Sequence, residues 1–209
     1  MNKEEFLIEL ATKYGTDKLG HSYMQEYSKN LPDKCRSMLE IGIASGASAL
    51  MWKEFYGADE LDLHYIDLFI NPEFVSPAWA KNRNITPHIG DQENLSFLST
   101  IHEQFEIIVD DGSHNAQSML ISFKHLFVNN LISGGIYCIE DLHCNDLPFY
   151  YGGDVKSFED TPKHMFKEYL QTGKIDNVYF NEGESKVFES LITSVTFGAD
   201  DKIVFITKK

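Results

Sequence analysis

The 209-residue sequence lacks the features that mark membrane, secreted and nucleic-acid-binding proteins. No apolar run approaches the roughly 20 residues that span a bilayer. The segment Met1–Glu5 carries acids and is followed by no apolar signal core. Basic residues are scarce, since 18 Lys and Arg stand against 32 Asp and Glu and the net charge is −14. Because basic side chains supply most of the affinity for phosphates, we expect no nucleic-acid partner and no binding to anionic membranes.

Cysteine is rare, and no linker divides the chain. Cys35, Cys138 and Cys144 form no C-x-x-C pair and are odd in number, so neither a structural disulfide nor a zinc site is supported. A reducing, cytoplasmic location is the simplest expectation. Without internal repeats, low-complexity tracts or Pro/Gly/Ser-rich linkers, we predict one domain over 1–209, with a helical N-terminal extension (1–34) and a core (35–209).

Apolar runs of strand length alternate with amphipathic helical segments through the chain. We predict strands over 37–43, 61–67, 85–89, 105–111 and 135–141, and helices over 3–14, 23–31, 46–56, 94–102, 115–129 and 162–171. This alternation is typical of α/β proteins with a doubly wound, Rossmann-like parallel sheet.

The end of the sequence departs from that alternation. Two further β-like runs, 191–197 and 202–207, flank the turn residues Gly198-Ala-Asp-Asp201 and predict a C-terminal antiparallel hairpin. Between the strands and this hairpin, the stretch 142–161 is rich in Tyr, Gly and Asp and is predicted to be a long irregular loop. Loops of this length inside a domain tend to be functional.

Small and acidic residues follow the first predicted strand, at the edge where a doubly wound sheet binds its ligand. In Glu40-Ile-Gly42-Ile-Ala-Ser45-Gly46-Ala-Ser48 the glycines allow a tight turn, and the following helix offers unpaired N–H groups. The spacing is not the dinucleotide fingerprint G-x-G-x-x-G. Glu40 suits a ligand with an ammonium group better than one with a pyrophosphate, and methionine-derived cofactors carry such a group.

Acids at the ends of the next two strands complete this predicted cofactor site. Asp67 ends the second strand, in the position of an acid that holds ribose hydroxyls. Gly90-Asp91-Gln92 follows the third strand and could reach an adenine ring. The E-x-G-x-x-x-G motif alone also fits a plain strand-to-helix turn, but its placement with Asp67 and Asp91 favours a cofactor site.

Two acidic motifs, Val109-Asp-Asp-Gly-Ser-His114 and Ile139-Glu-Asp-Leu-His143, follow the fourth and fifth strands. These strands are expected to be neighbours about 4.8 Å apart, so Asp111, Glu140 and Asp141 should converge. Such carboxylates repel one another unless a cation neutralises them, and oxygen ligands suit Mg²⁺, Mn²⁺ or Ca²⁺. Each motif alone is also compatible with a turn or a solvated loop start.

Histidines accompany the acidic motifs. A neutral imidazole at His114, beside the predicted metal, could take a proton from a substrate hydroxyl. His143 is a second, weaker candidate for this base. The remaining histidines are expected to be structural or exposed; they are His21, His64, His88, His102, His125 and His164.

Together these segments resemble the metal-dependent class I methyltransferases typified by the macrocin and mycinamicin sugar O-methyltransferases. Cephalosporin hydroxylase-like proteins share the same core. The matching segments are Tyr14-Gly-Thr-Asp-Lys18 with His21 and Tyr23, Glu40–Gly46, Asp110–His114 and Gly134–His143. The chain is shorter than the macrolide enzymes, so we expect no counterpart of their extra N-terminal domain. Macrolide specificity and oligomeric state therefore do not carry over, and a homo-oligomer stays an open alternative.

The resemblance implies roles for the matching residues. It implies that Asp111, Glu140 and Asp141 bind Mg²⁺ and that His114 is the general base. Thr16 is expected to close over the S-adenosylmethionine, and Asp110 is counted among the cofactor contacts. The implied acceptor is a hydroxyl of a sugar or a glycan-derived small molecule.

Two other functions are compatible with such a sheet. A nicotinamide-dependent oxidoreductase is disfavoured by the missing G-x-G-x-x-G and by Glu40, and calorimetric titration with S-adenosylhomocysteine and with NAD separates the two. A non-catalytic binding protein of the same fold is disfavoured by the intact acidic site. Clustered carboxylates are costly, and a chain that had lost its activity would be free to replace them by mutation. We therefore predict an S-adenosylmethionine-dependent, metal-assisted O-methyltransferase.

Overall fold

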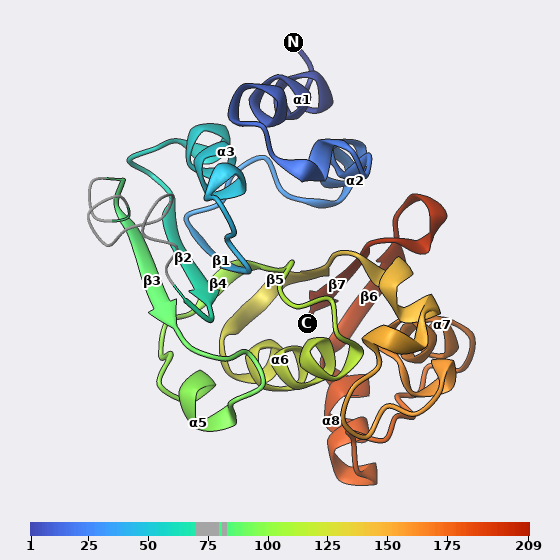
Figure 1. Ribbon diagram of the computed structural model, residues 1–209. Helices are drawn as coiled ribbons and strands as arrows, with labels where there is room; N and C mark the ends of the chain where they lie inside the picture. The colour runs from blue at the N-terminus through green and yellow to red at the C-terminus, as the bar shows by residue number, and fades with distance from the viewer. Residues whose placement is uncertain (70–79, 81–82) are drawn as a thin grey trace.

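A seven-stranded sheet in the order β3-β2-β1-β4-β5-β7-β6 organises the chain (Figure 1). The computed structural model describes residues 1–69, 80 and 83–209. The first five strands in this order pair in parallel, and β7 pairs antiparallel with both β5 and β6. The strands are β1 Ser37–Ile41, β2 Asp62–Asp67, β3 Ile85–Ile89, β4 Phe105–Asp110, β5 Leu131–Ile139, β6 Ile192–Phe197 and β7 Val204–Lys208. The predicted doubly wound sheet with a C-terminal antiparallel hairpin is confirmed.

Helices cover both faces of the sheet, and each face has its own apolar core. Among the described residues, the helices with defined bounds are α1 Lys3–Tyr14, α2 Tyr23–Asn30, α3 Ala47–Tyr56, α5 Leu95–Leu98, α6 Ala116–Asn129, α7 Pro162–Thr172 and α8 Glu182–Leu191. On one face lie α1, α2 and α3 (Figure 1). They contribute Leu7, Tyr27 and Trp52 to a buried apolar cluster. On the other face, α6 and α7 contribute Phe123 and Phe166. Because both faces are covered, the central strands are almost continuous runs of buried apolar residues.

Local capping explains where several helices begin and end. Asn2 and Glu5 form a reciprocal capping box at the start of α1, and Gly15 ends that helix in a left-handed conformation. Asn181 and Glu184 form a second capping box at the start of α8. Of the described helices, none is long and apolar enough to cross a lipid bilayer.

The structure corrects several predicted boundaries. The helix predicted over 94–102 is only the single turn α5, because the Ser99 and Thr100 hydroxyls bond back to carbonyls of that turn. Strand β5 begins at Leu131 rather than 135, so Gly134 and Gly135 lie inside it. Helix α8 was not predicted. The stretch 142–161 holds three short 3₁₀ turns rather than being wholly irregular; they are Leu142–Asp146, Pro148–Tyr150 and Phe158–Asp160.

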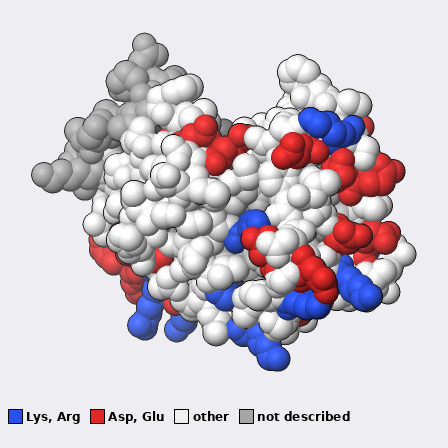
Figure 2. Space-filling view, turned by 90° about the horizontal axis from the view of Figure 1, so that it is seen from below, with Lys and Arg blue, Asp and Glu red and all other residues white. Residues whose placement is uncertain are grey.

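The surface reflects the acidic composition. Figure 2 shows several patches of Asp and Glu on the face in view, with most of its Lys and Arg side chains along the lower edge. These charges accord with the net charge of −14.

Gly42 is the point where the loops after β1 and β4 touch. Its φ of 81° is left-handed, and a Cβ there would overlap the Asp111 carbonyl oxygen. Its amide donates to the Ile66 carbonyl at 2.8 Å, and the Asp111 amide donates to the Ile41 carbonyl at 2.9 Å. Any side chain at position 42 would therefore separate the ends of two central strands.

This contact predicts a large cost for Gly42→Ala. Gly134 provides a matched control, because it has a similar φ of 78° but a Cβ added there would meet no described atom within 4 Å. Gly134→Ala should reduce the free energy of unfolding by about 1–2 kcal/mol, the left-handed penalty for alanine. Gly42→Ala should cost a further ~1–3 kcal/mol because of the clash. Urea unfolding measures both, and equal losses in the two variants would refute the contact.

Candidate active site

A cavity of about 670 Å³ lies at the carboxyl ends of β1, β2, β3 and β4. Seven of the predicted cofactor residues line it: Thr16, Gly42, Ser45, Ser48, Asp67, Asp91 and Gln92. Asp111 and His114 line the same cavity. Its volume is in the range of sites that enclose small-molecule ligands. Sequence positions spread from 16 to 114 thus meet in one space at the edge where such sheets bind ligands.

Hydrogen bonds hold the acids at two of these strand ends. Asp67 Oδ2 accepts from the Ile43 amide at 3.1 Å, which joins the ends of β1 and β2. Asp91 Oδ1 accepts from the Glu93 amide at 2.9 Å and shapes the turn after β3. Both carboxylates are therefore fixed in the cavity wall by backbone groups.

Three other predicted cofactor residues, Glu40, Gly46 and Asp110, are not among the described residues that line the cavity. Gly46 caps α3 in a left-handed conformation. Asp110 is buried and accepts from Ser122 Oγ at 2.5 Å and Gln92 Nε2 at 3.2 Å. Burial raises the pKa of Asp110, and these donors oppose that rise. Asp110 thus supports the cavity from behind by orienting Gln92.

Glu40, on β1, is completely buried and faces helix α3. Its carboxylate accepts from Ser48 Oγ at 2.9 Å and from Trp52 Nε1 at 3.4 Å. Burial raises the pKa of Glu40, while the nearby ammonium of Lys18 opposes that rise. Glu40 therefore acts in the interior, behind the cavity wall, as one of the acids around Lys18.

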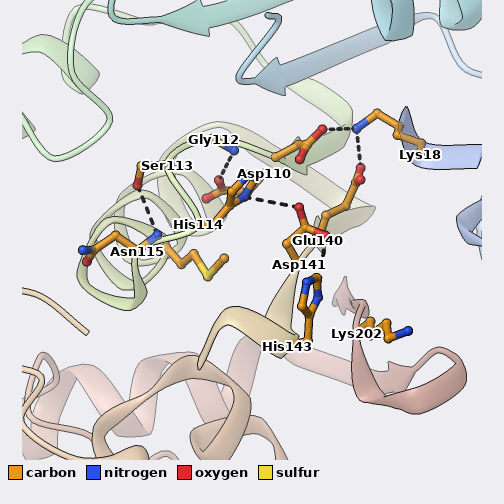
Figure 3. Close-up of polar contacts among 12 residues, drawn as sticks. Lys18, Asp110, Gly112, Ser113, His114, Asn115, Glu140, Asp141, His143 and Lys202 are labelled. Carbon is orange, nitrogen blue, oxygen red and sulfur yellow. Dashed lines mark hydrogen bonds and ion pairs between the residues drawn. The ribbon is translucent and has the colours of Figure 1, made fainter. Parts of the chain in front are cut away.

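The ammonium group of Lys18 lies among three carboxylates, those of Glu40, Asp111 and Glu140. Figure 3 shows Lys18 pointing toward Glu140. Lys18 stands on the 3₁₀ turn Asp17–Leu19, and its side chain is 1% exposed. Nζ donates to Glu140 Oε1 at 2.7 Å and to Asp111 Oδ2, and it lies 3.4 Å from Glu40 Oε1. Burial alone would lower the pKa of Lys18, but Glu140, Asp111 and Glu40 together raise it well above its usual value.

One ammonium does not balance three carboxylates. Burial, together with repulsion from Asp111, raises the pKa of Glu140 well above its usual value. Burial likewise raises the pKa of Asp111 despite its contact with Lys18. Tyr27 adds a hydroxyl that donates to Glu140 Oε1. The cluster therefore has an excess of negative charge, which a bound cation or a proton would neutralise.

Asp141 and His114 point toward each other from the ends of β5 and β4 (Figure 3), and both lie near Asp111. One ligand atom from each of these three side chains lies within 4.8 Å of the others. His114 Nδ1 is 3.4 Å from Asp141 Oδ2, yet it is buried without a hydrogen bond to any described residue. Tyr23 fixes the other Asp141 oxygen by donating to Oδ1 at 2.6 Å. An unpartnered imidazole nitrogen between two carboxylates fits a site for a bound cation.

Two further histidines, His21 and His143, lie near Asp141. His143 Nδ1 lies 3.8 Å from Asp141 Oδ1, and the His143 ring stacks on that of His21 with centroids 5.6 Å apart. Burial lowers the pKa of His143. Ligand atoms of His21, Asp141 and His143 also lie within 4.8 Å of one another.

Left-handed backbone at non-glycine residues marks the same loops. The φ values of Ala44, His114 and Asp141, after β1, β4 and β5, are 42°, 59° and 54°. Each such residue costs on the order of 1–3 kcal/mol unless its surroundings hold it in place. Strain of this kind concentrates at functional sites, and here it sets the directions of the His114 and Asp141 side chains.

Lys18 and Tyr27 were assigned no role from the sequence, although Lys18 lies in the N-terminal motif. The sequence does contain an indication of the role of Lys18. Converging buried carboxylates require a cationic partner, and Lys18 is the basic residue of that motif. The structure also places Glu140 with Lys18 and Tyr27, while Asp111 and Asp141 group with His114.

The ion cluster predicts a strong, pH-dependent effect of Lys18→Met. Leaving buried carboxylates without their cation should reduce the free energy of unfolding by about 3–5 kcal/mol near neutral pH. A carboxyl whose folded pKa is raised contributes stability below its unfolded pKa and loses it as the pH rises through the folded pKa. Because the variant raises these carboxyl pKa values further, its deficit should be smallest near about pH 5 and grow toward about pH 8.

Lys13→Met is the control for this prediction, because the Lys13–Glu54 ion pair is exposed and should contribute little. Denaturant titrations of both variants across this pH range measure the effect. A Lys18→Met deficit that is small or independent of pH would contradict the ion cluster.

Comparison with curated proteins identifies sugar O-methyltransferases as relatives. No family model matches the chain. L-olivosyl-oleandolide 3-O-methyltransferase of Streptomyces antibioticus is 31% identical over 193 residues, which cover 87% of this chain and 48% of that protein. Demethylmacrocin O-methyltransferase of Streptomyces fradiae is 31% identical over 187 residues, covering 76% of this chain and 45% of that protein. The chain thus spans about half the length of the curated relatives it matches.

Solved structures agree with this relationship. The MycE methyltransferase of the mycinamycin biosynthetic pathway, solved with Mg, SAH and mycinamycin VI, superimposes with a TM-score of 0.77 and 25% identity. The match covers 97% of this chain and 53% of that chain. The apo structure of CmcI-N160, at 16% identity and a TM-score of 0.54 over 92% of this chain and 72% of that one, supports the fold alone. The chain is therefore a homologue of the macrocin, mycinamicin and tetracenomycin sugar O-methyltransferases and has the class I methyltransferase fold.

Proposed function

We propose that the chain is an S-adenosylmethionine-dependent O-methyltransferase that uses a divalent metal ion and acts on a hydroxyl of a sugar or a glycan-derived small molecule. The observation that carries this proposal is the adjacency of two features. A ligand-sized cavity at the ends of β1 to β4 opens onto Asp111 and His114, and Asp141 lies within ligand distance of both. The named activities of the relatives support the same reaction class.

The cavity residues suit the cofactor. Asp67, fixed by the Ile43 amide, offers carboxylate oxygens to ribose hydroxyls. Asp91 and Gln92 would lie against the adenine, and the loop from Gly42 to Ser48, together with Thr16, would enclose the methionine end. Asp91, Gln92, Gly42, Ser48 and Thr16 all line the cavity. Glu40, Gly46 and Asp110 would act from behind this wall. S-adenosylmethionine supplies the electrophilic methyl group, and the chain's contribution is to position it against the acceptor.

The metal ligands we propose are Asp111, Glu140 and Asp141. Asp111 and Asp141 fit a cation by their spacing, and both described contacts to Glu140 use Oε1, so Oε2 is the oxygen that it would offer. Oxygen donors of this kind suit Mg²⁺. A bound Mg²⁺ would lower the pKa of the acceptor hydroxyl and orient it.

His114 is the proposed general base. It lines the cavity, its side chain is 33% exposed, and Asp141 lies 3.4 Å from its Nδ1. A histidine can accept a proton near neutral pH, so His114 would take the hydroxyl proton as the acceptor oxygen attacks the methyl group. The carboxylate of Asp141 would stabilise the resulting imidazolium.

The acceptor and the setting of the enzyme follow as further proposals. The segment 145–158 would form part of the acceptor pocket, and it exposes the apolar side chains of Leu147 and Phe149. Residues 1–209 would act as one methyltransferase domain, since the extension 1–34 shares a core with the sheet. Three buried free thiols support a cytoplasmic location.

The base assignment predicts the behaviour of His114→Ala. Turnover should fall by at least about 100-fold, the usual contribution of a general base. Affinity for S-adenosylhomocysteine should stay within a few-fold of the wild type, because the cofactor contacts remain. Methyl transfer to a panel of glycosides that includes mycinamicin VI, together with calorimetry, measures both.

His164→Gln is the control, because His164 lies on α7 away from the cavity lining. Near-normal turnover of His114→Ala with a glycoside that the wild-type enzyme methylates would contradict the assignment of His114 as the base. A wild-type chain that bound NAD but not S-adenosylhomocysteine would overturn the methyltransferase proposal itself.

A further inference from the structure

Two histidines and a carboxylate gather on the sheet away from the methyltransferase cavity. His64 lies on β2, His88 lies on β3, and Glu103 lies in the segment between α5 and β4. A ligand atom from each lies within 4.8 Å of the others. None of the three is among the described residues that line the cavity, so this cluster is separate from the proposed active site.

The hydrogen bonding of His64 leaves the lone pair of one ring nitrogen available to bind a metal ion. His64 Nε2 lies 3.2 Å from Asp62 Oδ1. Because a carboxylate accepts hydrogen bonds, the proton of the neutral ring belongs on Nε2 and the lone pair on Nδ1. That Nδ1 lies 2.8 Å from His88 Nε2. A histidine oriented by a carboxylate in this way is the usual arrangement behind a metal-bound imidazole.

Packing holds the His64 ring in this orientation. His64 is 4% exposed, and its ring lies edge-on to Phe105, with centroids 5.2 Å apart. The rings of His64 and His88 stack with centroids 5.1 Å apart. The two imidazoles are thus held side by side, with a carboxylate within reach.

We propose that His64, His88 and Glu103 bind Zn²⁺, or a divalent transition metal with similar preferences, and that Asp62 orients His64. Two imidazole nitrogens and one carboxylate oxygen are a common protein ligand set for zinc, whereas Mg²⁺ prefers oxygen alone. Tetrahedral ligands at about 2.0–2.1 Å from zinc lie roughly 3.3 Å apart, so the two nitrogens would separate by about half an ångström on binding. A zinc prediction based on cysteines overlooks this site because its ligands are histidines on neighbouring strands.

Metal binding here would tie the edge strand β3 to β2 and to the segment before β4. His88 lies two residues before Gly90, and Gly90 to Gln92 line the cofactor cavity. A bound zinc ion would therefore stabilise the folded chain and restrain the end of β3 that forms the adenine side of the cavity.

Zinc binding to the full chain tests the site. Equilibrium dialysis with Zn²⁺ in millimolar Mg²⁺, which keeps the proposed magnesium ligands occupied, should give about one bound zinc per wild-type chain. His88→Gln and Glu103→Gln should lose or greatly weaken this binding. Asp62→Asn should weaken it by about 10–100-fold, the usual effect of removing a carboxylate that orients a ligand. The His88 and Glu103 variants are the decisive ones, because His64 is buried and its substitution could prevent folding.

Two controls separate this site from the active site. Asp111→Asn should retain the zinc, and His88→Gln should retain binding of S-adenosylhomocysteine. If the wild-type chain bound no more zinc than the double variant His88→Gln/Glu103→Gln, the proposal would be overturned. The cluster would then be a hydrogen-bonded histidine pair without a metal. Loss of the zinc in Asp111→Asn, with retention in His88→Gln, would also overturn it by placing the ion at the other cluster.

Discussion

The buried ammonium of Lys18 is the interaction on which the functional edge of the sheet depends. It joins the N-terminal extension to Glu40 of β1, Asp111 after β4 and Glu140 after β5. Burying these charges costs free energy by desolvation, so such a cluster is a poor way to gain stability alone. The cluster instead fixes relative positions, because it holds the turn at Asp17–Leu19 and the ends of three strands together at one point.

Lys18 compensates only part of the negative charge of the surrounding carboxylates, and the remaining negative charge favours the binding of a cation. Three carboxylates meet one ammonium, and a fourth carboxylate, Asp141, stands next to them with His114 beside it. Burial, together with repulsion within this excess of negative charge, raises the pKa values of Asp111 and Glu140. A divalent cation would relieve the same excess, which is why the electrostatics and the proposed metal-assisted reaction agree.

Much of the fold could be predicted from sequence, because buried parallel strands are apolar runs whose periodicity survives in the chain. The misses have local causes. In α8 only Ser185 and Phe188 are buried, so its apolar stripe was too weak to detect. The glycines at 134 and 135 concealed the first residues of β5.

The site was predictable to the extent that strand ends place side chains. Asp67 ends β2, Asp91 and Asp111 lie within two residues of the ends of β3 and β4, and all three line the cavity. Lys18 was not assigned, because its burial arises only when segments more than 90 residues apart converge. Glu40 was expected to face the ammonium group of a ligand, and in the structure it faces the ammonium group of Lys18.

The central claim is that a divalent cation binds at Asp111 and Asp141 beside a cofactor in the cavity. A crystal structure of the chain with S-adenosylhomocysteine and Mn²⁺, with anomalous differences measured at the manganese edge, tests it most directly. We expect an anomalous peak between the Asp111 and Asp141 carboxylates and the cofactor between Asp67 and Gly42. Cofactor bound in the cavity with no manganese at these carboxylates would contradict the metal-assisted mechanism, and cofactor bound elsewhere would contradict the proposed site as a whole.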